Sequence, residues 1–174
     1  MSGALVDYNA GGGGDLDAIK SDGTATARDP ITGQITLTSA TTYYVPIGTD
    51  SALVPSMVAL VALHLTWSAA IVLTATLETC NFPKYRGGQP AIGPATDVSD
   101  VDTTAGNWLQ EFLSSANVPI TGGAVAANAI TSTPALGGAM IHVGNLGSRR
   151  MRLKLVVGGT GGTVRVNRRG KQAA

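Results

Sequence analysis

Residues 149–168 read RRMRLKLVVGGTGGTVRVNR, and this stretch decides the predicted fold. Polar and apolar residues alternate on both sides of a glycine-rich link at 158–162. Because successive side chains of a strand point to opposite faces, each half is predicted to be a strand with one apolar face. The link supplies residues that accept positive φ, so we expect a β-hairpin. The residues expected to face the core are Met151, Leu153, Leu155, Val164 and Val166.

The same stretch is basic. The last 26 residues hold eight of the twelve Lys and Arg of the chain and no acid. On the predicted hairpin the basic side chains share one face, which is the candidate partner-contact face. Its members are Arg149, Arg150, Arg152, Lys154, Arg165 and Arg168. Acidic surfaces of neighbours or nucleic-acid phosphates would suit it, and a solvated face without a partner is the third interpretation. The segment has no aromatic residue for base stacking, which disfavours single-strand binding.

Composition points to one domain whose surface is partly covered by neighbours. The chain has 174 residues, enough for one core and short for two. Only 13% of residues are charged, against about 25% in an ordinary soluble domain. The net charge is +1, yet every acid lies at or before Glu111. This separation of charge favours oriented packing against partners over general nucleic-acid binding.

An uncharged run at 52–77 raises the question of a membrane span, because it would pass an ordinary hydropathy threshold. Its β-branched residues, Pro55 and a polar interruption at 66–69 instead predict two strands, 57–67 and 71–78, joined as a buried hairpin. We therefore expect no membrane span. The first residues lack a basic start and an apolar segment, so no secretory signal is expected either.

The chain divides into an extended N-terminal arm, residues 1–31, and a β-sandwich domain, residues 32–174. The arm is rich in Gly and Asp, and two interpretations stay open: a disordered tail, or an arm that lies on a neighbouring subunit. A surface excursion is expected near 82–104. Residues 107–113 have the i, i+4 spacing of a short helix, with a strand as the alternative. Roughly six to eight strands predict an all-β protein, an antiparallel β-sandwich or jelly roll with long loops.

Catalytic groups are sparse. The two histidines, His64 and His142, fall within predicted strands, and no nucleophile elbow is present, so we expect packed or interface histidines. Cys80 is alone, which rules out an intrachain disulfide and disfavours a zinc site. Glu78 and Glu111 are the only glutamates, and nothing places them as a catalytic pair. We expect neither enzymatic activity nor a cofactor.

An acidic loop at 97–102 offers three carboxylates, from Asp97, Asp100 and Asp102, that could bind calcium. It lacks the full spacing and the glycine of an EF-hand loop, so a solvated acidic loop is the favoured interpretation and no metal site is predicted. The glycine clusters at 11–14 and 158–162 are not followed by Lys-Ser/Thr and a helix, so a linker and a turn explain them better than phosphate binding.

The order of these segments carries a resemblance. Val58–Trp67 and Ile71–Asn81 form strand, turn and strand, a tryptophan segment follows, and Ile141–Leu153 leads into the glycine turn. This order resembles small β-sandwich virion proteins of tailed bacteriophages, over about residues 40–170. The N-terminal arm and the Pro/Gly-rich excursion depart from the pattern and leave the subfamily open.

The resemblance implies a non-enzymatic structural protein, a capsid decoration or cement protein that stabilises the shell at contacts between capsomers. It implies localisation in the virion after assembly in the host cytoplasm. The implied partners are the major capsid protein or other virion proteins, together with self-association, a trimer being the expected form. A tail, neck or fibre component that binds host carbohydrate is the alternative, with Tyr85 and Trp108 as candidate sugar-binding aromatics. A nucleic-acid-binding module is less favoured, and for it Arg152→Glu with Arg165→Glu is expected to abolish binding.

Overall fold

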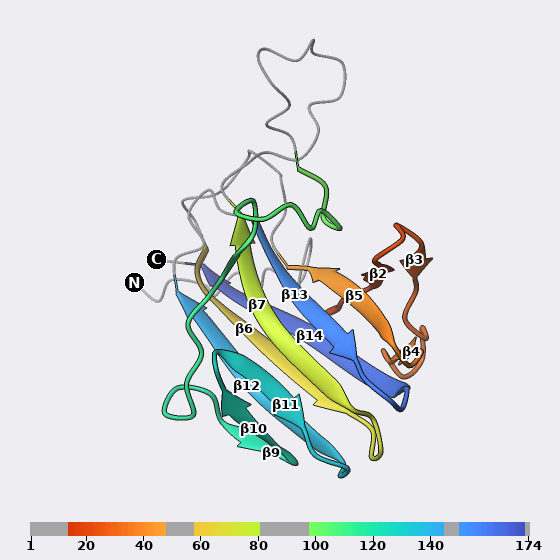
Figure 1. Cartoon of the computed structure of the whole chain (residues 1–174). Coiled ribbons are helices and arrows are strands. Elements are labelled where there is room, and N and C mark those ends of the chain that lie inside the picture. The colour runs from red at the N-terminus through yellow and green to blue at the C-terminus, as the bar shows by residue number, and fades with distance from the viewer. Residues whose placement is uncertain (1–13, 48–57, 81–97, 145–149, 173–174) are drawn as a thin grey trace.

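The structure is a computed structural model that describes residues 14–47, 58–80, 98–144 and 150–172. Within these residues the protein is all-β: a six-stranded and an eight-stranded antiparallel sheet face each other, which confirms the predicted β-sandwich (Figure 1). No helix among the described residues is long and apolar enough to cross a membrane.

The six-stranded sheet has the order β1-β14-β6-β12-β9, with β4 also pairing with β14. Its strands are β1 (Gly14–Asp15), β4 (Ile35–Leu37), β6 (Val58–Trp67), β9 (Ile120–Thr121), β12 (Gly137–Gly144) and β14 (Gly162–Gln172). The eight-stranded sheet has the order β10-β11-β7-β13-β5-β2-β3, with β8 also pairing with β7. Its strands are β2 (Ala18–Lys20), β3 (Ala25–Thr26), β5 (Thr41–Pro46), β7 (Leu73–Cys80), β8 (Leu109–Gln110), β10 (Gly123–Ala126), β11 (Ala129–Ser132) and β13 (Arg150–Val157).

Both predicted hairpins are wrong in their pairing. β13 pairs with β5 and β7, whereas β14 pairs with β6, β4 and β1. β6 and β7 likewise belong to different sheets. A hairpin would place the apolar faces of its two strands on one side of one sheet. A crossing between sheets sets those faces against each other and so forms the core.

The two crossings lie side by side and are joined by hydrogen bonds. The Ser68 backbone N–H donates to the Thr163 carbonyl at 2.9 Å, and the Val72 N–H donates to the Thr160 carbonyl at 3.2 Å. The glycine-rich link matters for this close approach, because a Cβ on Gly161 would lie 2.5 Å from the Leu37 carbonyl oxygen. The glycines therefore serve a crossing between sheets instead of a hairpin turn.

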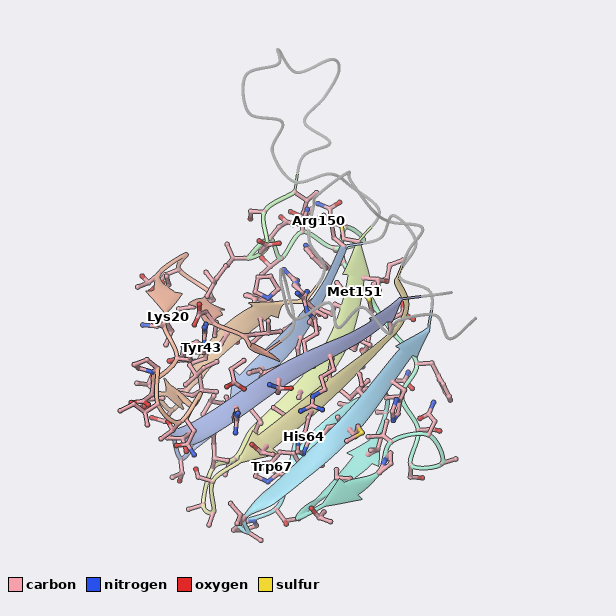
Figure 2. All side chains as sticks on the ribbon, turned by 180° about the vertical axis from the view of Figure 1, so that it is seen from behind. Lys20, Tyr43, His64, Trp67, Arg150 and Met151 are labelled. Atoms are coloured by element: carbon pink, nitrogen blue, oxygen red, sulfur yellow. The ribbon has the colours of Figure 1, made fainter. Side chains whose placement is uncertain are left out.

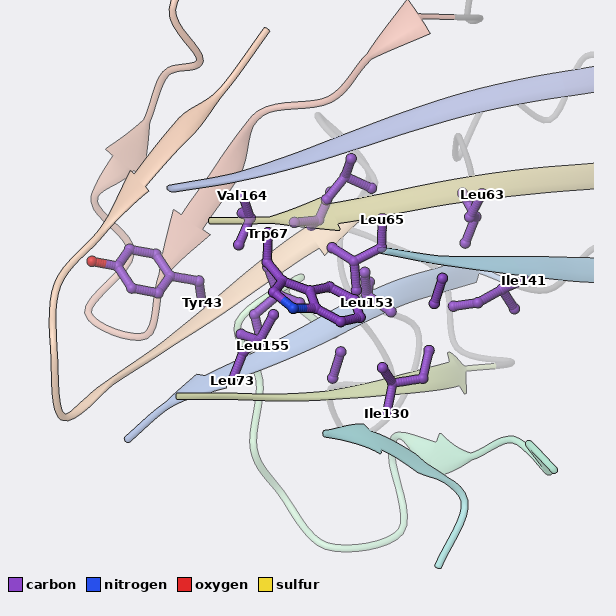
Figure 3. Close-up of a cluster of buried hydrophobic side chains, with 14 of the residues drawn as sticks. Tyr43, Leu63, Leu65, Trp67, Leu73, Ile130, Ile141, Leu153, Leu155 and Val164 are labelled. Carbon is purple, nitrogen blue, oxygen red and sulfur yellow. The ribbon is translucent and has the colours of Figure 1, made fainter. Parts of the chain in front are cut away.

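The core lies between the sheets, and Trp67 is at its centre (Figure 3). The five core residues predicted from the C-terminal alternation are confirmed as buried: Met151, Leu153, Leu155, Val164 and Val166. The Trp67 ring packs directly on the backbone of β12, since a Cβ on Gly137 would lie 2.6 Å from the indole. The strand β6 is not covered on both sides, because Leu63, Leu65 and Trp67 are buried and His64 is exposed.

Three further expectations differ from the structure. Residues 14–31, predicted as part of the arm, contain β1, β2 and β3, and Ala18 is fully buried; residues 1–13 lie outside the described residues. Of the predicted excursion, 82–97 lies outside the described residues, and the part from Val98 onward packs on the eight-stranded sheet. Of the two interpretations of 107–113, the helix is wrong and the strand holds for Leu109–Gln110, which form β8; Trp108 contacts the arginines of the sheet, whereas Phe112 is exposed.

Candidate functional site

The structure does not bring the six predicted contact residues onto one face. Arg150, Arg152 and Lys154 lie on the outer side of the eight-stranded sheet, alternating with core residues of β13. Arg165 lies on the outer side of the other sheet, because β14 belongs there. Arg168, three residues further along, turns inward and donates to the Ile47 carbonyl, and burial lowers the pKa of its guanidinium. Arg149 lies outside the described residues.

Arg152 is buried with a full set of partners. It is 2% exposed, and its Nε donates to Glu78 Oε2 at 2.7 Å. Its Nη1 donates to the carbonyls of Asp100 and Asp102, at 2.6 and 2.8 Å. The guanidinium plane lies between two aromatic rings, 4.1 Å from the centroid of Tyr44 and 4.0 Å from that of Trp108. Such pairing and stacking is what a planar guanidinium needs in order to be buried.

Arg150 completes this cluster, which we call the arginine clasp (Arg150, Arg152, Glu78, Asp100 and Trp108). Arg150 is 5% exposed; its Nη2 donates to Asp100 Oδ1 and its Nη1 to the Val98 carbonyl, each at 2.5 Å. The two arginines thus donate to the backbone carbonyls of every second residue in this segment, residues 98, 100 and 102. The clasp holds this segment on the eight-stranded sheet, so these arginines serve the fold.

Several sequence candidates are accounted for by the clasp and its surroundings. Glu78 binds Arg152 and lies 3.7 Å from the partly exposed Lys154, while Glu111 accepts from the Thr79 hydroxyl. Asp100 is buried in its ion pair, and Asp102 accepts from the Thr104 hydroxyl and the Asn107 amide. Across the described ranges no group of three His, Cys, Asp or Glu side chains that could hold a metal is present. Asp97 lies outside those ranges.

The outer side of the six-stranded sheet is exposed and basic. Register places three rows across β14, β6 and β12: Arg165–Thr66–Gly138, Asn167–His64–Met140 and Arg169–Ala62–His142. We call Arg165, Arg169, His64 and His142 the basic face; all four are exposed, and His64 can be located on β6 in Figure 2. A depression of about 380 Å³ lies here, lined by Ala62, His64, Thr66, Met140, Arg165, Asn167 and Arg169.

The carboxylate of Asp15 is bound to this face. Asp15 on β1 lies opposite Asn167, and its Oδ1 accepts from Arg165 Nε at 2.7 Å and from Asn167 Nδ2 at 3.0 Å. Its Oδ2 accepts from Arg165 Nη2 at 3.0 Å. The hydrogen bond from Arg165 holds the pKa of Asp15 below its usual 3.8, so this carboxylate is ionised at neutral pH.

Sequence reasoning found Arg165 and missed Arg169. The signal was present, because residues 165, 167 and 169 lie on one side of a strand and residue 168 lies on the other. The histidines were expected to be packed or at an interface, and both are exposed here. Their place on the same face as Arg165 and Arg169 depends on the register of β6 and β12, which the local sequence does not show.

Comparison of the chain with protein-family models, with curated proteins and with solved structures finds no match. The chemistry of the two outer sides of the sandwich is therefore the basis for a functional proposal.

Proposed function

We propose that this protein is a non-enzymatic structural protein of a phage virion, which decorates the capsid and stabilises the shell through subunit contacts. The observation that carries the proposal is the exposed basic face on a two-sheet body. Together with the resemblance in segment order, this face supports docking on another virion protein, the major capsid protein being the first candidate. Exposed charged side chains such as Arg169 steer and orient such contacts.

The opposite side of the body has different chemistry. An uncharged row crosses four strands of the eight-stranded sheet: Thr131, Thr74, Val156 and Thr42 lie in register on β11, β7, β13 and β5. Val156 is 39% exposed. A body with a basic face on one sheet and an uncharged row on the other suits a protein that lies between unlike neighbours, and this row supports self-association.

The alternative roles have less support among the described residues. Trp108, a candidate for sugar binding in a tail or fibre protein, is covered by the two clasp arginines, and Tyr85 lies outside the described residues. Phe112 is the exposed aromatic that sequence reasoning missed. For a nucleic-acid module, Arg152→Glu is no test of binding, because Arg152 is buried and its loss would disturb the fold.

Mass spectrometry of density-purified particles tests the proposal. We expect the protein in mature heads after the tails have been removed, and we expect heads of a deletion phage to release DNA at a lower temperature. Recovery with the tail fraction alone would favour the tail alternative. Absence from purified particles would contradict the virion role altogether.

A further inference from the structure

The depression on the basic face, which we call the trough, lies over β6. Along this central strand the outward residues are Ala62, His64 and Thr66, while Arg165 and Arg169 on β14 line one side. Met140 on β12 borders the other side. The trough runs along the strand direction from Ala62 to Thr66, a length of about 13 Å at the usual rise per residue. An extended segment laid parallel to β6 would match this length.

Charge determines which kind of segment fits. Two arginines and two histidines lie on this face, and Asp15 is the carboxylate that contacts it among the described residues. Both Arg165 and Asn167 donate hydrogen bonds to the Asp15 carboxylate. Arg169 is exposed, and it forms no ion pair with any described residue. Arg165 therefore has a carboxylate partner within the chain, whereas a ligand that carries carboxylates could pair with Arg169.

Asp15 shows how the face binds a carboxylate, through an arginine fork and the amide of Asn167 on the next outward position. Arg169 follows Asn167 by one further two-residue step, about 6.7 Å along the strand. An extended peptide repeats its same-side residues at this interval. When an acidic residue of a bound segment contacts Arg169, the next residue on the same side of that segment can therefore lie over His64.

We infer that the trough on the basic face binds an extended acidic segment of a partner protein, with Arg169 and His64 as its main contacts. This inference rests on the proposed assembly role and names the chemistry of the partner. Phosphodiesters are the less favoured ligand, because the residues that line the trough include no Phe, Tyr or Trp on which bases would stack.

Fluorescence anisotropy with a labelled peptide of alternating glutamate and glycine tests the inference. We expect binding that weakens with salt and that Arg169→Glu reduces by about tenfold or more. Lys20→Glu is the matched control, since it makes the same change of charge on β2 in the other sheet and should leave affinity nearly unchanged. Asp15→Asn should strengthen binding several-fold, because it releases Arg165 for the peptide.

Equal affinities for the Arg169→Glu and Lys20→Glu proteins would overturn the inference. Tighter, Arg169-dependent binding of an oligothymidylate than of the peptide would also overturn it and would identify a nucleic-acid site. The virion role and the peptide site are tested by different results. A protein that is present in particles but does not bind the peptide keeps its structural role, whereas a protein that binds the peptide but is absent from particles loses that role.

Discussion

Replacing Arg152 with methionine should lower the free energy of unfolding by about 3–5 kcal/mol, the usual effect of removing one partner of a buried ion pair. The substitution leaves the nearly buried Glu78 with Lys154 alone, at 3.7 Å, and it removes this donor from the carbonyls of residues 100 and 102. It also removes the planar group between the rings of Tyr44 and Trp108. The segment from Val98 to Trp108 should loosen before the rest of the fold.

Urea unfolding followed by circular dichroism measures this effect. Arg165→Met is the matched control, since Arg165 also pairs with a carboxylate but is about half exposed, and we expect it to cost below about 1 kcal/mol. The double variant Arg152→Met, Glu78→Met should recover part of the loss, because the nearly buried carboxylate is removed together with its arginine. Equal and small effects of Arg152→Met and Arg165→Met would contradict the assignment of the clasp to the fold.

Replacing Trp67 with alanine should cost about 3–5 kcal/mol, the range for deleting a large aromatic side chain from a packed core. The residue is 2% exposed, and its ring packs on Gly137 of β12 and near Gly123 of β10, so it joins the two sheets. Neither glycine has a side chain that could move to fill the space, and a cavity should remain.

Thermal and urea unfolding of the purified variant measure the loss. Val72→Ala serves as the control, because Val72 is 48% exposed and its truncation should stay within about 0.5 kcal/mol. A Trp67→Ala protein as stable as the Val72→Ala protein would show that the sheets are not joined through this residue.

The sequence predicted the last two strands, β13 and β14, and their buried faces, because alternation is a local property. It did not predict how those strands pair. A hairpin and a crossing between sheets have the same alternating pattern around the same glycine-rich link. The choice depends on partners such as β5 and β7 for β13, which are distant in the chain.

The candidate site shows the same limit. From the sequence, Arg150 and Arg152 looked like exposed charges, since their own segment contains no acid. Their partners, Glu78 and Asp100, are 74 and 50 residues away. By contrast, Arg169 could have been chosen over Arg168 by counting alternate positions along β14. The burial of Arg150 and Arg152 could be recognised only from the tertiary structure. The outward positions of β14, by contrast, follow from the two-residue period of a strand.

Arginine-specific modification with a dicarbonyl reagent, followed by peptide mass spectrometry, tests most directly whether the basic residues of the C-terminal segment have two separate roles. We predict fast modification of Arg169, little modification of Arg150 and Arg152, and loss of the Arg169 reaction when the protein is bound to its particle. Modification of Arg150 and Arg152 at the rate of Arg169, or an Arg169 that reacts equally in the free and bound protein, would contradict this account.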